Sequence, residues 1–126
     1  MARLEHVNLT ARDPLAFAKV LDTLFDWKIR WQGKAINNGY SVHVGDNASY
    51  LAIYAPPGDL GAAAPLSYET VGGLNHLGVV VDDLDATEVK VKAAGYRTHS
   101  HADYEPGRRF YFDGPEGVEI EVVSYS

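Results

Sequence analysis

The hydrophobic positions of the first 56 residues predict one strand, one helix and three further strands. Residues 3–10 are rich in β-forming side chains, and Asp13-Pro14 then marks a helix start, with Asp as the N-cap and Pro in the first turn. From Leu15 to Phe25, apolar residues recur at three- and four-residue spacing, which predicts an amphipathic helix. Three strands are expected next, over residues 27–31, 40–44 and 49–55.

The last 53 residues predict the same order of elements. A strand is expected over residues 74–81, followed by a helix from Asp82-Asp83 to Ala94 that Gly95 ends. The remaining strands are expected over residues 96–101, 109–112 and 118–123. Residues 57–73, rich in Pro, Gly and Ala, are expected to be a connector. We therefore expect a single domain, 1–126, of two modules that span residues 1–56 and 74–126.

The two modules also repeat a short motif. Leu4-Glu5-His6-Val7-Asn8-Leu9 opens the first, and Leu74-Asn75-His76-Leu77-Gly78-Val79 opens the second, so that 70 residues separate His6 from His76. Asp13 and Asp83, at the two helix starts, keep the same offset. A duplicated module that retains its histidine indicates metal chemistry between the halves.

Composition narrows the possible functions. The net charge of −6 argues against a protein that follows nucleic acid phosphates, and no apolar run is long enough to span a bilayer. The N-terminus lacks the apolar region of a signal peptide, so we expect a cytoplasmic protein. The chain has no cysteine, which excludes thiolate catalysis and Cys-ligated zinc. Any metal must be held by His, carboxylate, Tyr or water.

Strand alternation predicts which side chains share a face. His6 lies opposite Val7 and Leu9, and on the last strand Glu119 and Glu121 lie opposite Ile120 and Val122. A carboxylate on the face without a helix needs a partner or a polar cavity, because burying it alone is costly. Two imidazoles and one carboxylate form the facial arrangement that leaves metal positions open for substrate. Glu119 competes with Glu121 for the carboxylate role.

Two βαβββ modules, a histidine on the first strand of each, and the turn Phe112-Asp113-Gly114-Pro115-Glu116-Gly117 before the last strand resemble the vicinal oxygen chelate superfamily. This superfamily includes glyoxalase I, extradiol dioxygenases, fosfomycin-resistance transferases and bleomycin-binding proteins. The resemblance implies an α+β fold whose two modules form a curved eight-stranded sheet arrangement. It also implies that His6, His76 and Glu121 bind a divalent metal ion (Fe, Mn, Ni or Zn), and that the chain forms a homodimer.

The chain departs from glyoxalase I at one ligand. Alignment of the two modules places Ala52 where that enzyme has a fourth, carboxylate ligand, so the resemblance implies a three-ligand site. The segment from Phe110 to Glu121 is similar to the extradiol dioxygenase signature, which implies a catalytic Tyr111. His101 is the candidate for the signature's histidine, and His99 is expected on the same strand face.

We therefore expect a metal-dependent enzyme, dioxygenase or lyase, whose small substrate chelates the metal through adjacent oxygens. Extradiol-type chemistry is slightly favoured. The alternative is a metal-free binding protein of the bleomycin-resistance type. Arg108-Arg109 can meet an anionic substrate or form a solvated edge, and the sequence leaves both open. Tyr50, Tyr54, Asn8 and Trp31 are candidates to line the cavity, and the face of His43 is undecided.

Overall fold

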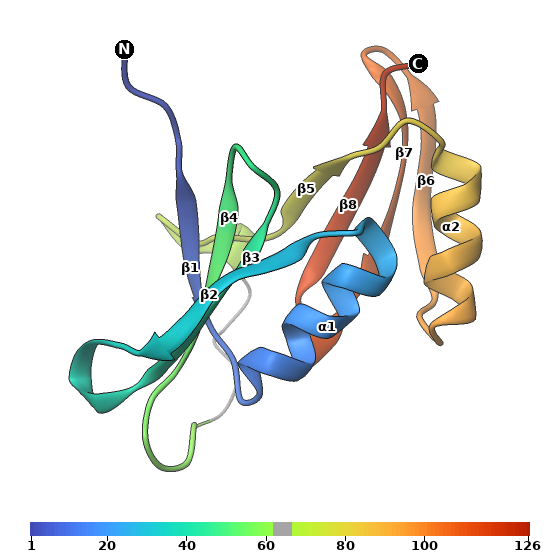
Figure 1. The fold of residues 1–126 in the computed structure, drawn as a ribbon. Helices are drawn as coiled ribbons and strands as arrows, with labels where there is room; N and C mark the ends of the chain where they lie inside the picture. The colour runs from blue at the N-terminus through green and yellow to red at the C-terminus, as the bar shows by residue number, and fades with distance from the viewer. Residues whose placement is uncertain (62–66) are drawn as a thin grey trace. The chain divides into compact units, whose positions relative to one another are not determined.

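The computed structural model describes residues 1–61 and 67–126, and the chain divides into two compact units, Met1–Gly61 and Ala62–Ser126. Each unit holds one four-stranded sheet and one long helix (Figure 1). We call Met1–Gly61 the first half of the chain and Ala62–Ser126 the second half.

The first half contains, in order, β1 (His6–Thr10), α1 (Pro14–Phe25), β2 (Lys28–Lys34), β3 (Tyr40–Gly45) and β4 (Tyr50–Ala55). The strands form a sheet in the order β1-β4-β3-β2, with β1 parallel to β4 and the other pairs antiparallel. Helix α1 packs on one face of this sheet (Figure 1). Its Phe17 and Leu21 are buried together with Val42 and Ile53, because the apolar stripe of the helix matches the inward face of the strands.

The second half repeats this plan with β5 (Leu77–Val80), α2 (Leu84–Ala93), β6 (Thr98–Tyr104), β7 (Gly107–Asp113) and β8 (Glu119–Ser124). The sheet order is β5-β8-β7-β6, and β5 is parallel to β8. Helix α2 packs against β6 and β8. Val91 of the helix is fully buried with Phe110, Ile120 and Val122.

The predicted α+β fold of two βαβββ modules is confirmed by these two sheets. Both helices begin at the expected residues, since Asp13 and Asp83 each accept a hydrogen bond of 3.0 Å from the backbone N–H three residues later. Helix α1 ends at Phe25 and is followed by the C-cap Asp26, a non-glycine residue in the left-handed conformation (φ 58°), which the sequence did not predict. Strand β5 begins at Leu77, so His76 lies just before the strand on which it was expected.

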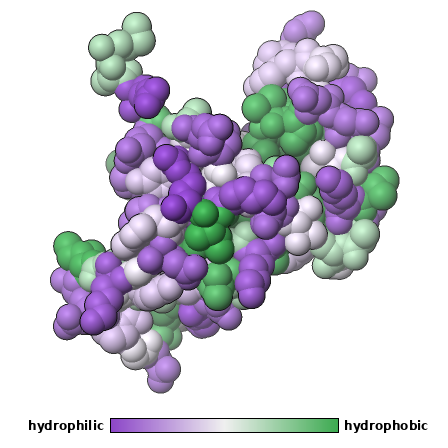
Figure 2. All heavy atoms as spheres, in the orientation of Figure 1, coloured by the Kyte–Doolittle hydropathy of each residue, from purple (hydrophilic) through white to green (hydrophobic). Residues whose placement is uncertain are grey.

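On the face shown in Figure 2, hydrophobic side chains appear as separate patches among hydrophilic ones. No helix in the described part of the chain has the length and apolar character needed to cross a membrane.

Candidate functional site

Two of the three predicted metal ligands meet in the second half. His76 Nε2 lies 3.1 Å from Glu121 Oε1, and both side chains are mostly buried. Glu121 projects from β8 on the face opposite Ile120 and Val122, which are fully buried. Strand alternation therefore carries the carboxylate away from α2, as the sequence predicted.

A third residue, Tyr68, fixes the proton on His76. Tyr68 belongs to a short 3-10 turn, Ser67–Glu69, in the segment expected to be a connector. Its hydroxyl donates to Glu119 Oε1 at 2.5 Å and also lies 3.1 Å from His76 Nδ1. The hydrogen bond to Glu119 raises the pKa of Tyr68 to about 12, so the phenol keeps its proton. Because that single proton is given to Glu119, the Tyr68 oxygen can only accept from His76, and Nδ1 must carry the hydrogen.

This tautomer decides what His76 offers to Glu121. With hydrogen on Nδ1, the Nε2 atom of a neutral imidazole presents a lone pair. The 3.1 Å contact of Nε2 with Glu121 Oε1 is a hydrogen bond when the ring carries a second proton, and it is bridged by a cation when Nε2 keeps its lone pair. Two ligands at right angles around an octahedral divalent ion are about 3 Å apart when the metal–ligand bonds are about 2.1 Å long. The His76–Glu121 pair therefore fits two adjacent positions of a divalent metal ion.

The remaining carboxylate oxygen has a protein partner. Arg109 Nη1 donates to Glu121 Oε2 at 2.7 Å, and its side chain is only 17% exposed. The sequence left open whether Arg108-Arg109 is a solvated edge. In the structure Arg109 is turned inward, while Arg108 pairs with Asp85 near the surface.

Tyr111, the predicted catalytic residue, lies beside the same pair. It is in register with Glu121 across β7 and β8, and its ring makes an edge contact with the His76 ring at 5.5 Å. Burial, the Glu121 charge and a hydrogen bond to Glu121 raise the pKa of Tyr111. The phenol therefore stays protonated and can act as a hydrogen-bond donor.

The third predicted ligand, His6, is in the first half. Its Nδ1 donates to Glu5 Oε1 at 2.8 Å, and Tyr50 donates to the same oxygen at 3.1 Å. The hydrogen bond from His6 is the largest cause of a lowered pKa for Glu5. A carboxylate that holds the Nδ1 hydrogen leaves Nε2 as the metal-binding atom, an arrangement typical of metal-ligating histidines.

His6 also begins a row of rings that crosses the first sheet. Its ring stacks on Tyr50 at 5.0 Å, Tyr50 stacks on His43 at 4.7 Å, and His43 contacts Trp31 at 4.9 Å. The row takes one ring from each of the four strands. Arg30 lies over the Tyr50 ring at 4.6 Å. His43, whose face the sequence did not decide, therefore shares the face of His6, and burial lowers its pKa.

The registers of the two sheets identify equivalent positions. Ala52 pairs with Asn8 and His43 in the first sheet, as Glu121 pairs with Gly78 and Tyr111 in the second. Ala52 therefore occupies the place that Glu121 holds in the other half, in agreement with the sequence alignment of the modules. Alanine offers no ligand atom, so only the second half supplies a carboxylate at this position.

His101 lies on the other face of the second sheet. Its Nε2 is 2.7 Å from Glu88 Oε2 of α2, and its ring contacts the buried Phe110 at 6.1 Å. A β-bulge between His99 and Ala102, with Ser100 at φ 56°, reverses the alternation of β6. His99, expected on the same face as His101, instead stacks on Tyr111 at 6.3 Å. The structure thus brings Tyr111 to the His76–Glu121 pair and leaves His101 beside the helix.

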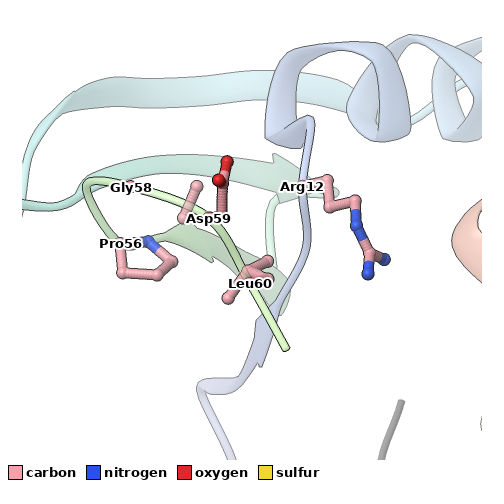
Figure 3. Close-up of a pocket in the computed structure, with 6 residues that line it drawn as sticks. Arg12, Pro56, Gly58, Asp59 and Leu60 are labelled. Atoms are coloured by element: carbon pink, nitrogen blue, oxygen red, sulfur yellow. The ribbon is translucent and has the colours of Figure 1, made fainter. Parts of the chain in front are cut away.

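Among residues 1–61 and 67–126, no three His, Asp or Glu side chains form a group that could hold a metal ion. The His76–Glu121 pair is the part of the predicted triad that lies within one half. A separate hollow of about 510 Å³ near the end of β4 is lined by loop residues and Arg12. Figure 3 shows Arg12 directed away from Asp59 there, so this hollow does not present a matched set of polar groups.

Two residues of this arrangement were not considered as site residues, Glu5 and Tyr68, while Arg109 was left as either a substrate contact or part of a solvated edge. Glu5 directly precedes a predicted ligand, and that adjacency is a signal that could have been used. Tyr68 lies in a Pro- and Gly-rich segment, where no periodicity indicates which side chains point inward.

The fold and the paired imidazole and carboxylate define a class of protein. A family model described as the Glyoxalase/Bleomycin resistance protein/Dioxygenase superfamily matches residues 3–122. The chain therefore belongs to this superfamily, and the predicted resemblance is confirmed.

Solved structures share the fold at low sequence identity. A glyoxylase/bleomycin resistance protein/dioxygenase domain from Frankia sp. EAN1pec is 20% identical, with a TM-score of 0.81 and 98% of each chain covered. TnmS3, an antibiotic binding protein from Streptomyces sp. CB03234, is 15% identical, with a TM-score of 0.76 and coverage of 100% of this chain and 98% of that one. The fosfomycin resistance protein FosX from Listeria monocytogenes, complexed with Mn(II) and a dihydroxypropylphosphonic acid, is 16% identical, with a TM-score of 0.72 and coverage of 98% and 92%. No curated protein matches the chain.

Proposed function

We propose that this protein is a metal-dependent enzyme that acts on a small substrate with two adjacent oxygen atoms. His76, Glu121 and His6 would hold one divalent ion, with His6 supplied by the same chain or by a second copy. The observation that carries the proposal is the 3.1 Å separation of His76 Nε2 and Glu121 Oε1, in a ring whose Nδ1 contacts the Tyr68 hydroxyl. Support for a divalent ion also comes from the Mn(II) complex of FosX, which shares the fold.

The roles of the other side chains follow from their contacts. A bound divalent ion supplies Lewis acidity, which lowers the pKa of a coordinated hydroxyl or stabilises an enolate. Tyr68 and Glu119 hold His76 in the ligating tautomer, and Glu5 does the same for His6. Tyr111 would donate a hydrogen bond to a substrate oxygen, since its raised pKa keeps the phenol protonated. His101 has no role in this proposal, because it lies on the helix face.

Metal analysis tests this proposal. Purified protein is incubated with Mn²⁺, Fe²⁺, Ni²⁺ or Zn²⁺, desalted, and its metal content measured. We expect about one ion per chain in the wild type. We expect loss of the ion in both His76→Ala and Glu121→Ala, with an unchanged content in Asp59→Asn, a variant of an exposed loop residue. Absence of stoichiometric metal from the wild type would exclude the proposal.

A second candidate is a metal-free protein that binds small molecules, and one observation favours it. Arg109 already provides a cationic partner for Glu121, so the carboxylate is not left unpaired without a metal ion. TnmS3, an antibiotic binding protein, shares the fold. This function predicts that the wild type takes up no divalent ion and that His76→Ala leaves ligand binding intact.

We also propose that the protein acts as a homodimer. Helix α1 covers one face of the first sheet, while the ring row on the other face includes Trp31, which is 49% exposed. An aromatic face of this kind is suited to contact with another protein surface. Light scattering would then give a mass of twice 13.8 kDa, and the mass of a single chain at micromolar concentration would contradict the proposal.

A further inference from the structure

Arg109 presents an unused part of its guanidinium group on the face of β7 that carries Tyr111. Only Nη1 is engaged, by Glu121 Oε2 at 2.7 Å. The other two nitrogens, Nε and Nη2, are buried and have no hydrogen-bond partner among the described residues. Buried donors are nearly always paired in folded proteins, so two free donors on one cation require an explanation.

The geometry of the free atoms indicates what they can bind. Guanidinium is planar, and the N–H of Nε points in parallel with one N–H of Nη2. These two hydrogens form the edge that matches the two oxygens of a carboxylate, a phosphonate or a phosphate. Nη1 lies outside this edge, so its contact with Glu121 leaves the paired N–H groups of Nε and Nη2 available. Arg109 can thus hold Glu121 and an oxyanion at the same time.

The neighbouring Arg108 does not share this combination of burial and unpaired guanidinium nitrogens. Arg108 has a 48% exposed side chain and pairs with Asp85 at 2.9 Å, so water and a carboxylate satisfy it. Arg109 lies 5.9 Å from the ring of Tyr104, which is exposed and can turn into solvent without disturbing the core. An oxyanion that binds at the free edge must displace the groups that bury these two nitrogens.

We propose that Arg109 binds the oxyanion of the substrate through its Nε and Nη2 atoms, beside the His76–Glu121 pair. The proposal rests on the proposed function for its setting, and it names the substrate class as small organic acids that carry a carboxylate or a phosphonate. Glu121 fixes the guanidinium through Nη1, which orients the free edge. The substrate's adjacent oxygens and its acidic group are then recognised by different side chains.

Side-chain NMR tests this in the metal-free protein, where no ion can hold the anion. The Nε–H resonance of Arg109 is assigned by its loss in Arg109→Lys and followed during titrations with acetate, methylphosphonate and neutral acetamide. We expect a saturable shift of this resonance with at least one anion and none with acetamide. The anion that gives the tighter binding identifies the acidic group. An unmoved Arg109 resonance with both anions would overturn the proposal.

Calorimetry with the same anions supplies an independent measurement. Arg109→Lys should weaken binding at least 10-fold, because an ammonium lacks the fork, whereas Arg108→Lys should bind as the wild type does. An anion affinity of Arg109→Lys equal to that of the wild type would also overturn the proposal. If Arg109→Lys fails to fold, the NMR titration of the wild type still decides. Failure to bind metal leaves these anion measurements unaffected, so the two proposals can fail separately.

Discussion

The Tyr68 hydroxyl controls the chemistry that His76 can perform. It donates to Glu119 and accepts from Nδ1, and both contacts are made through one oxygen atom. Without the hydroxyl, His76 is free to move its hydrogen to Nε2 and donate to Glu121 instead. In that tautomer Nε2 has no lone pair for a metal ion.

Tyr68→Phe should therefore weaken metal binding while it leaves the fold intact. The expected loss in affinity for zinc is roughly 10-fold or more, the usual effect of removing a group that orients a ligating histidine. Competition with a chromophoric chelator measures the affinity. Tyr40→Phe is the matched control, because the Tyr40 hydroxyl donates to the exposed Gln32. Equal zinc affinity in Tyr68→Phe and Tyr40→Phe would show that the Tyr68 hydroxyl does not orient His76 for metal binding.

Glu88 is the residue through which the helix face of the second half responds to pH. Its carboxylate accepts from Thr98 at 2.5 Å and contacts His101 at 2.7 Å, and Lys92 lies 3.6 Å away. The hydrogen bond from Thr98, followed by that from His101, lowers the pKa of Glu88 below 4.5. A carboxyl whose pKa is lowered by folding stabilises the native state above its unfolded pKa, and this contribution is lost as pH falls through the folded value.

Glu88→Gln should thus destabilise the protein at pH 7 by about 1 kcal/mol, the usual contribution of such hydrogen bonds. The difference from the wild type should shrink as pH falls below about 4.5. Urea unfolding at pH 7 and at pH 3.5 measures both values. An equal difference in unfolding free energy between Glu88→Gln and the wild type at the two pH values would show that the Glu88 charge does not contribute to stability.

At the scale of elements, the β3–β4 hairpin depends on a close backbone approach at Gly45. A Cβ atom there would collide with the Ser49 carbonyl oxygen and lie 2.6 Å from the Tyr50 Cα. These are backbone atoms of the hairpin turn and of the first residue of β4, and they cannot move without disturbing the β3–β4 pairing. Tyr50 stacks on both His6 and His43, so the position of the ring row depends on this approach.

Gly45→Ala should therefore cost about 2 kcal/mol or more in the free energy of unfolding, as overpacked sites do. Gly78→Ala is the control, because a Cβ atom on that strand residue meets nothing within 4 Å. Urea denaturation of the two variants gives the comparison. A smaller loss in Gly45→Ala than in Gly78→Ala would contradict the packing described here.

The elements themselves were largely predictable from the sequence. The Asp-Pro and Asp-Asp helix starts, the three- and four-residue apolar spacing of α1 and the alternation of β8 each have a direct local cause, and the structure confirms them. The bulge in β6 was not predictable, because no spacing marks Ser100 as a residue with positive φ. The placement of His101 depended on that one residue.

At the scale of the whole molecule, the duplication predicted the part of the site that strand alternation controls. Glu121 and Tyr111 share the face expected for them, and Ala52 occupies the position equivalent to Glu121. The duplication gave no information about Tyr68, which precedes the second module, or about Arg109. The direction of a long arginine side chain depends on its partners, and these are known only from the folded sheet.

X-ray absorption spectroscopy at the zinc edge counts the imidazole ligands and so tests whether two histidines and one carboxylate bind one metal ion. The zinc-loaded wild type should show two imidazole ligands, completed by oxygen atoms. His6→Ala and His76→Ala should each reduce the count to one, or release the zinc. A wild-type spectrum with one imidazole or none, or a His6→Ala spectrum that still shows two, would contradict the proposed centre.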